Sequence, residues 1–315
     1  MKRLLSLIVV ICLILSTASC SRPSSVSTPS LPSTSNYPTA IPSTVQASTS
    51  PTTSSTPPSN ALPSKELKVY FLDVGQGDSE IVRYGDSTML IDAGTNASTN
   101  TLLSDIRGLG IKRFDVVIGT HPHEDHIGGM DAIINTFDIG TIYMPKVPST
   151  TKTFTDVLTA IKNKGLTVTT PVPGSTFYLG DCQCTILAPN SQSYQDMNNY
   201  SIVIRLAYRS TSFLFTGDAQ VDSEQEMLSK GYNLKADVLK VGHHGSNSST
   251  SPDFLKAVSP QIAVISVGAG NDYGHPHPVT LQKLASAGVK IFRTDLNGTV
   301  VITSDGTSVK VGTTK

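Results

Sequence analysis

The seven histidines of the chain fall in three short clusters, and none lies elsewhere. The clusters are His121, His123 and His126 in the run THPHEDHIGG, His243 and His244 in KVGHHGS, and His275 and His277 in YGHPHP. Histidines that serve only in packing would be scattered along the chain. Clustered imidazoles are typical of metal ligands and of groups that carry protons.

The first cluster also contains Asp125, so four candidate ligands fall within six residues. Neutral imidazole and carboxylate are the ligands that suit zinc and similar divalent ions. The preceding run 114–118, Phe-Asp-Val-Val-Ile, predicts a short buried strand that ends just before the cluster. Ligands on a loop at the carboxyl end of a strand lie where α/β proteins build their sites. A polar surface loop would not account for the other two clusters.

The run His-x-His-x-Asp-His at 121–126 resembles the metal-binding signature of the metallo-β-lactamase fold. Further runs resemble, in order, the soluble domain of ComEC-type competence proteins: FLDVGQGDS at 71–79, LIDAG at 90–94, NNYS at 198–201, TGD at 216–218, LKVGHHGS at 239–246 and GHP at 274–276. The likeness extends from about residue 67 to the C-terminus. Two β-rich halves with helices outside favour an α/β fold, a four-layer α/β/β/α metallo-β-lactamase sandwich with the site at the strand ends.

The resemblance implies one or two divalent ions, zinc or manganese. It places His121, His123 and Asp218 on the first metal. Many enzymes of this fold carry a third histidine there, but no histidine lies between the first cluster and the second in this chain. Asn199 is the candidate replacement. Because an amide oxygen is a harder and weaker ligand than imidazole, we expect this site to be looser or to favour manganese.

The second metal is expected on Asp125, His126 and one histidine of the second cluster, with Asp218 bridging the two ions about 3.5–4 Å apart. We favour His243, because it follows its strand directly, while the reverse assignment with His244 as the ligand stays open. His244 would then contact substrate or carry a proton.

The resemblance further assigns catalysis to Asp125, which also binds metal, to His244, and to His275 as a substrate contact. Asp92, two residues before Gly94, is expected to support a ligand histidine through a hydrogen bond. Cys182 and Cys184 are two residues apart on an expected strand, so both face one side and a disulfide between them would be strained.

The first 64 residues are not expected to belong to the folded domain. Residues 1–20 begin with a positive pair, continue in an apolar run too short to span a bilayer and end in small residues before Cys20, which is typical of a signal peptide. The end of this run resembles a bacterial lipoprotein cleavage site, although Thr17 stands where that pattern prefers leucine. We expect an extracellular protein that is anchored to the membrane by lipid at Cys20, with ordinary secretion as the alternative.

Residues 21–64 predict a disordered linker, because 31 of these 44 residues are serine, threonine or proline and none is acidic. Residues 65–315 suit one metallo-β-lactamase-like domain with a sizeable core. All 24 acidic residues but only 21 of the 24 basic ones follow residue 64, so this domain has a formal net charge of −3. A domain that held long duplex DNA by electrostatics would be more basic.

The leading hypothesis is a surface-tethered, metal-dependent hydrolase, a phosphodiesterase or nuclease that uses a water activated by one or two metals. The resemblance implies DNA, single-stranded or short, as the phosphodiester substrate, and no protein partner is evident. One alternative is a hydrolase of another ester, such as the phosphorylcholine of cell-wall polymers, because fold alone does not fix function. Another is a non-catalytic surface binding module, which the nearly complete ligand set disfavours.

Overall fold

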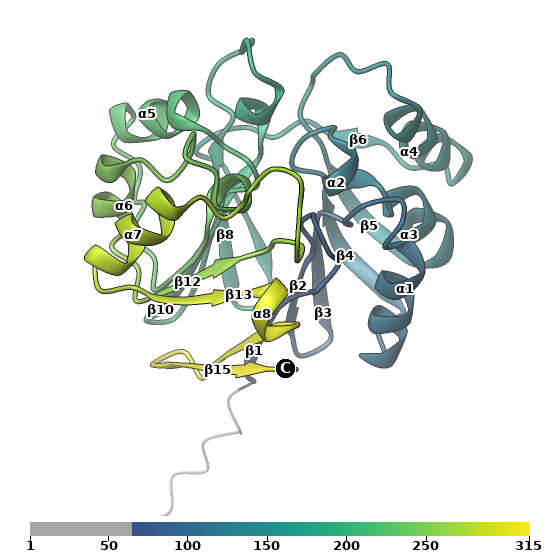
Figure 1. Ribbon diagram of the computed structural model, residues 1–315. Coiled ribbons are helices and arrows are strands. Elements are labelled where there is room, and N and C mark those ends of the chain that lie inside the picture. Colours follow the sequence, from purple (N-terminus) through teal and green to yellow (C-terminus); the bar gives the residue numbers. More distant parts are fainter. Residues whose placement is uncertain (1–64) are drawn as a thin grey trace, which may run out of the picture. The chain divides into compact units, whose positions relative to one another are not determined.

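The computed structural model describes residues 65–315, so the expected signal peptide, linker and Cys20 lie outside the described residues. Two β-sheets pack face to face in the middle of the domain, with helices on both outer sides (Figure 1). The predicted four-layer α/β/β/α sandwich is therefore confirmed. Among residues 65–315, no helix is long and apolar enough to cross a membrane.

The first sheet has eight strands in the order β15-β14-β1-β2-β3-β4-β5-β6. They are β1 (Leu67–Phe71), β2 (Glu80–Tyr84), β3 (Ser87–Ile91), β4 (Arg113–Ile118), β5 (Asp138–Tyr143), β6 (Val168–Thr169), β14 (Val300–Ser304) and β15 (Val309–Thr313). Strands β3 to β6 are parallel to one another, as expected where helices connect strands. Apolar faces of α1 (Thr99–Gly108), α3 (Met130–Thr136) and α4 (Lys152–Asn163) cover this sheet.

The second sheet has seven strands in the order β13-β12-β11-β10-β9-β8-β7. They are β7 (Thr176–Leu179), β8 (Cys182–Ala188), β9 (Val203–Tyr208), β10 (Thr211–Phe215), β11 (Val238–Lys240), β12 (Ile262–Ile265) and β13 (Lys290–Arg293). The helices α5 (Val221–Ser229), α6 (Pro252–Val258) and α7 (Pro278–Ser286) cover its outer face, and the short α8 (Thr294–Asn297) follows β13.

The central core lies between the two sheets and is built from strand side chains of both. Phe71 of β1 stacks on Phe215 of β10 across this interface, with 6.1 Å between ring centroids. Cys182 and Cys184 of β8 are buried in the same core as free thiols, so they share one face of the strand as predicted. Burial of these apolar faces provides the main driving force that holds the two halves together.

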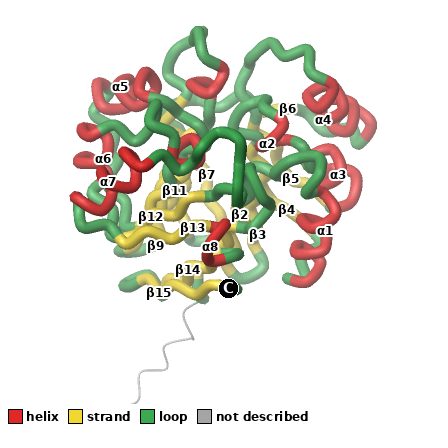
Figure 2. The backbone as a smooth tube through the Cα atoms, viewed as in Figure 1, coloured by secondary structure: helices red, strands yellow, loops and turns green. Residues whose placement is uncertain are grey.

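The ends of several strands meet on one side of the sandwich. Strands β3 and β4 of the first sheet and β10, β11 and β12 of the second run parallel within their sheets, so their carboxyl ends share an edge. Loops and short helices extend from that end (Figure 2). The α2 turn (Glu124–Ile127) follows β4, and the 3₁₀ turns η1 (Met197–Tyr200) and η2 (Gly242–Gly245) precede β9 and follow β11. The first two histidine clusters lie on the connections after β4 and β11, and the third lies on the loop between β12 and α7.

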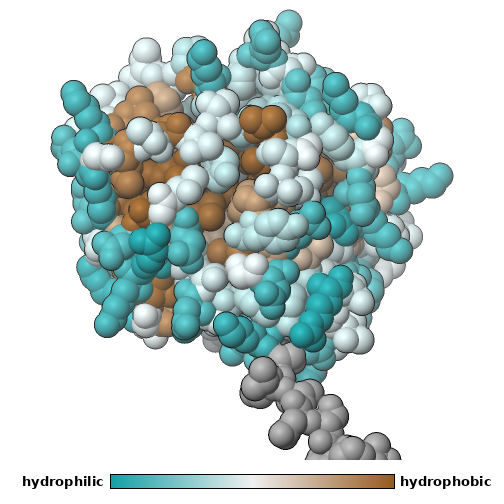
Figure 3. Space-filling model, turned by 180° about the vertical axis from the view of Figure 1, so that it is seen from behind, coloured by the Kyte–Doolittle hydropathy of each residue, from teal (hydrophilic) through white to brown (hydrophobic). Residues whose placement is uncertain are grey.

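Large apolar side chains also reach the surface in places, among them Leu158, Val168 and Val172. Seen from behind, the domain carries a gathering of apolar residues among polar ones (Figure 3). Apolar atoms form much of the surface of any folded protein, because polar atoms cannot cover the whole of it.

Candidate metal centre

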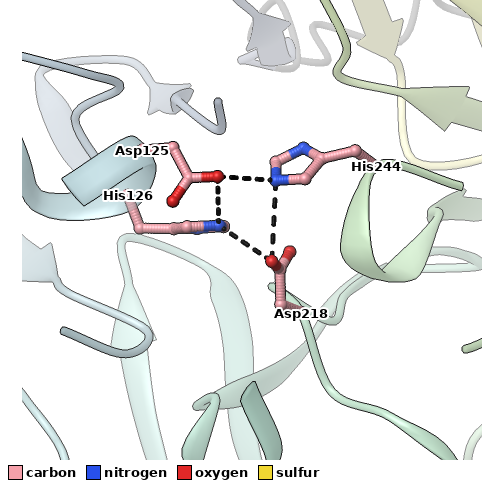
Figure 4. Close-up of side chains that lie close together, drawn as sticks. All are labelled: Asp125, His126, Asp218 and His244. Atoms are coloured by element: carbon pink, nitrogen blue, oxygen red, sulfur yellow. Dashed lines mark ion pairs between the residues drawn. The ribbon is translucent and has the colours of Figure 1, made fainter. Parts of the chain in front are cut away.

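Two carboxylates and two imidazoles converge where the halves of the sandwich meet (Figure 4). Asp125 and His126 come from α2, Asp218 follows β10, and His244 lies in η2 after β11. One ligand atom from each of the four residues lies within 4.8 Å of the others. Asp218 Oδ2 is 3.2 Å from His126 Nε2 and 3.5 Å from His244 Nε2, and Asp125 Oδ2 is 3.2 Å from His244 Nε2.

His121 and His123 adjoin this group. His121 Nε2 is 3.0 Å from His123 Nδ1 and 3.9 Å from the same Oδ2 atom of Asp218. Asp218 is thus within reach of both the His121–His123 pair and the group around His126, which is the position expected of a bridging carboxylate. The side chains of His121, His126 and Asp218 are almost completely buried.

Hydrogen bonds orient the two buried imidazoles. His126 Nδ1 is 2.7 Å from Asp92 Oδ2, and His244 Nδ1 is 2.9 Å from the backbone oxygen of Ser266. Since carboxylate and carbonyl oxygens only accept, each Nδ1 carries a proton, and each Nε2 faces the centre of the group, where a bound metal would replace the Nε2 proton. Metal-binding histidines are held in this way. The expected supporting role of Asp92 agrees with this geometry.

The charges of the group are mutually dependent. Burial alone would lower the pKa of His126, but the carboxylates of Asp218, Asp92 and Asp125 raise it well above its ordinary value. Burial likewise opposes protonation of His244, whose pKa Asp218 and other carboxylates nevertheless raise to about 10. Clustered carboxylates therefore create a site that favours positive charge.

A divalent cation fits this site on the chemistry of its donors. His126 Nε2, His244 Nε2 and Asp218 Oδ1 are buried and have no hydrogen-bond partner in the described residues. Buried polar atoms are normally satisfied, and a bound ion can satisfy those that have no protein partner. Imidazole nitrogen and carboxylate oxygen are the ligands of zinc, and both also serve manganese and iron. The donor set does not select among these metals.

The structure places His244 where the sequence favoured His243. Both residues have positive φ angles, 51° and 52°, so η2 turns sharply and sends the two side chains apart. His244 is buried against Asp125 and Asp218. His243 is partly exposed, with Nδ1 3.2 Å from Ser248 Oγ and Nε2 3.7 Å from Asp218 Oδ2. The geometry thus favours the reverse assignment, with His244 in the ligand group and His243 at its rim.

Asn199 does not face the ligand group with its amide oxygen, contrary to the expected ligand role. Its Oδ1 atom accepts hydrogen bonds from the backbone N–H groups of Gln220 and Ser223, at 3.0 and 3.3 Å. These are free N–H groups at the start of α5, so Asn199 caps that helix from a distance. Its neighbour Asn198 lines the cavity beside the site instead, and its buried Oδ1 atom has no partner among the described residues.

A cavity of about 520 Å³ opens beside the ligand group. His275 lines it together with His243 and His244, as expected of a residue that contacts substrate. Burial and the nearby His243 lower the pKa of His275 to about 4, so its imidazole is neutral at pH 7. Its buried Nδ1 atom has no hydrogen-bond partner in the described domain and remains available to a ligand.

The spacing of the histidines does not predict that three further residues, Lys240, Asp78 and Gln76, lie in this region. Lys240 is 1% exposed, and its ammonium lies 2.5 Å from Asp78 Oδ2, while Asp78 Oδ1 is 3.2 Å from His244 Nδ1. Gln76 lines the cavity, with Oε1 held by the N–H of Gly268 at 3.1 Å and Nε2 without a partner in the described residues. Asp78 and Gln76 belong to the GQGDS run, so their position was foreseeable only from the family likeness.

The comparisons with known proteins agree with this geometry. ComE operon protein 3 of Bacillus subtilis (strain 168) is 33% identical over 255 residues, which cover 75% of this chain and 33% of that protein. Competence protein ComA of Neisseria gonorrhoeae is 32% identical over 252 residues, 76% of this chain and 32% of its own. The resemblance to ComEC-type competence proteins is thereby confirmed, and the chain spans about a third of the length of these relatives.

Among solved structures, the diiron beta-hydroxylase CmlA from Streptomyces venezuelae matches with a TM-score of 0.51 and 15% identity. The match covers 77% of this chain and 54% of that one, and it shows a shared fold alone. The family model of the metallo-beta-lactamase superfamily matches residues 72–269, which include the first two histidine clusters and Asp218. With its sandwich fold and its ligand group at the strand ends, the chain belongs to the metallo-beta-lactamase superfamily.

Proposed function

We propose that this protein is a metal-dependent phosphodiesterase that acts on nucleic acid outside the cell. The observation that carries the proposal is the buried group of Asp125, His126, Asp218 and His244, whose unpartnered atoms converge beside a cavity. Relatives named for competence and recombination support a nucleic-acid substrate over other esters.

The four residues of the group would hold one ion, and His121 and His123 with Asp218 would hold a second. A divalent ion in this position would supply a Lewis acid and an activated water for attack on phosphorus. The protein contributes the fixed orientation of the ligands, because Asp92 and the Ser266 carbonyl hold the two buried imidazoles in place. Preorganised groups of this kind need not reorganise during the reaction.

Substrate contacts would come from the cavity wall. The Gln76 amide can donate to a phosphate oxygen from its unpartnered Nε2 atom, and the neutral His275 can donate or accept from Nδ1. Asn198 Oδ1 can accept from a water or a sugar hydroxyl. None of these three groups carries a charge, so they would position the substrate and leave the ligand group to stabilise negative charge.

Metal analysis and a substrate panel test this proposal. Full-length protein should bind zinc or manganese and hydrolyse bis(p-nitrophenyl) phosphate and a single-stranded oligonucleotide. Asp218→Asn should lose metal and lower the rate by about a hundred-fold or more, as expected for loss of a group that stabilises the transition state. Asp253→Asn is the matched control, because Asp253 is exposed on α6.

The outcome decides among the alternatives. Metal-loaded protein that hydrolyses phosphocholine esters but neither phosphodiester would support another ester hydrolase. Metal-loaded protein that hydrolyses none of these substrates, yet binds the oligonucleotide or a cell-wall polymer, would support a binding module.

Surface tethering through Cys20 belongs to the same proposal and rests on the sequence. Cys20→Ala should release the protein from the membrane fraction or leave it unprocessed. Wild-type protein found entirely in the culture medium with an unmodified N-terminus would contradict the anchor.

A further inference from the structure

The loop between β12 and α7 places a tyrosine at the mouth of the cavity. Tyr273 is 65% exposed, although it lines the same cavity as Asp218, His243 and His244. Tyr178 on β7 is equally exposed and lines no part of that cavity. A solvent-exposed aromatic ring beside a ligand group is available to a flat, partly apolar ligand.

The ring of Tyr273 lies on a wall that is already ordered. It stacks on His275, with 5.6 Å between ring centroids and 23° between planes, and His275 in turn packs edge-on against His243 at 5.4 Å. Asn271 fixes the loop: Oδ1 accepts from the N–H groups of Tyr273 and His275, and Nδ2 donates to the carbonyls of Gly268 and His275. One face of the ring is therefore supported, while the residue as a whole remains largely exposed.

The chemistry of this wall favours a nucleobase over a quaternary ammonium group. Quaternary ammonium ligands such as choline are bound in cages of several aromatic rings. Tyr273 is the only tyrosine, phenylalanine or tryptophan that lines the cavity in residues 65–315. A single supported ring instead suits base stacking, which tolerates any base because each has a π-face.

The strand that fits is single. Bases within a duplex are already stacked on both faces, so only an unpaired base can lie on Tyr273. No lysine or arginine lines the cavity in the described part of the chain, and the domain has a formal net charge of −3. Because such cations strengthen the binding of duplex and single-stranded DNA alike, the choice of a single strand rests on the need for an unpaired base at Tyr273.

We propose that Tyr273 is a base-stacking residue that holds one unpaired nucleobase next to the phosphodiester to be cleaved. The proposal rests on the proposed phosphodiesterase function and specifies its substrate as single-stranded nucleic acid. Tyr273 would act through substrate binding, so its replacement should leave the metal content and the fold unchanged.

The test compares two single strands of equal length with metal-loaded, full-length protein. One strand carries thymine on every sugar, and the other carries abasic sugars throughout. Tyr273→Ala should lower kcat/KM on the thymine strand by roughly 5- to 150-fold, the range for loss of one base–aromatic contact. It should leave cleavage of the abasic strand unchanged. Tyr273→Phe, which keeps the ring, and Tyr178→Ala, the matched exposed tyrosine, should both stay within about twofold of wild type on either strand.

Other results would overturn the assignment. Equal losses on both strands would show a role for Tyr273 in catalysis or loop structure. No loss on either would show that the ring does not contact the base, and a selective loss on a phosphocholine ester would show a choline contact. If wild type cleaves neither strand, the phosphodiesterase proposal fails separately. Fluorescence anisotropy of the labelled strands then decides: Tyr273→Ala must weaken binding of the thymine strand alone, and equal affinity in wild type and variant would refute stacking.

Discussion

The buried ion pair between Lys240 and Asp78 gives the strongest stability prediction for this domain. Lys240 on β11 belongs to the second sheet, and Asp78 lies in the turn between β1 and β2 of the first. Their charged atoms are 2.5 Å apart, and both side chains are 1% exposed. Lys240 Nζ also donates to the Val241 carbonyl at 3.1 Å. The pair joins the two halves, and its Asp78 member also lies 3.2 Å from His244.

Lys240→Met removes the charge and keeps most of the aliphatic volume. Asp78 would then remain buried with Glu80 nearby and without its nearest cation, while His244 stays 3.2 Å from Asp78 Oδ1 and offsets part of the loss. Breaking a buried pair in this way costs about 3–5 kcal/mol, against a total stability of roughly 5–15 kcal/mol for a typical domain. Glu80 moderates the loss, because burial and Asp78 already raise its pKa well above 4.5 and favour its neutral form. We therefore expect a loss near the lower end, about 3 kcal/mol.

Urea unfolding of the full chain at pH 7 measures this loss, with EDTA present so that metal binding does not contribute. Lys152→Met is the matched control, because Lys152 pairs with Asp156 at the same 2.5 Å distance on the exposed face of α4. That variant should show no measurable change, since exposed ion pairs contribute little. Lys240→Met with Asp78→Asn should recover part of the loss. A Lys240→Met variant as stable as the Lys152→Met control would refute the reasoning.

Three further predictions concern neighbouring groups. His244→Ala should lower the affinity for zinc by more than roughly 10- to 100-fold, which is the loss typical when a ligand loses only its supporting hydrogen-bond partner. His243→Ala should keep the metal, and elemental analysis after gel filtration distinguishes the two variants. Asn199→Ala should destabilise the protein by about 0.5–2 kcal/mol in urea unfolding with unchanged metal content, because it removes a helix cap. Glu80 has a pKa raised by burial and by Asp78, so the folded state retains a proton that the unfolded chain releases above about pH 4.5. The free energy of unfolding should therefore fall as pH rises from 4.5 through that raised pKa, and Glu80→Gln should remove this fall.

Much of the ligand group could be predicted from the sequence, because its residues follow predicted strands at short distances. The run 114–118 predicted a strand that is β4 in the structure, and His121 to His126 lie on the connection after it. Asp218 similarly follows β10. Because each of these residues follows its strand closely along the chain, it must lie near the end of that strand. A correct prediction of the strand therefore also predicts where the residue lies in the fold.

Other features depend on information that is not local. Two consecutive positive φ angles determine which of His243 and His244 lies in the ligand group, and the residue types at those positions do not predict such angles. The Asn199 side chain binds the start of a helix that begins 22 residues later. Strand β14 pairs with β1 across more than 200 residues, and the sequence between them gives no sign of that partner. Pairings of this kind are fixed by the completed fold.

The turn between β1 and β2 explains how ligands from two sheets reach one centre with fixed geometry. Asp78 N–H donates to the Asp125 carbonyl at 3.1 Å, while the Asp78 carboxylate contacts Lys240 and His244. A side chain at Gly77 would place its Cβ atom 2.5 Å from the same Asp125 oxygen, so glycine is required for this approach. One turn thus contacts a ligand-bearing segment from each half. Because Asp78 contacts both halves, through its backbone N–H on one side and its carboxylate on the other, a shift of either sheet would be resisted close to the ligand group, where the geometry matters most for binding a metal.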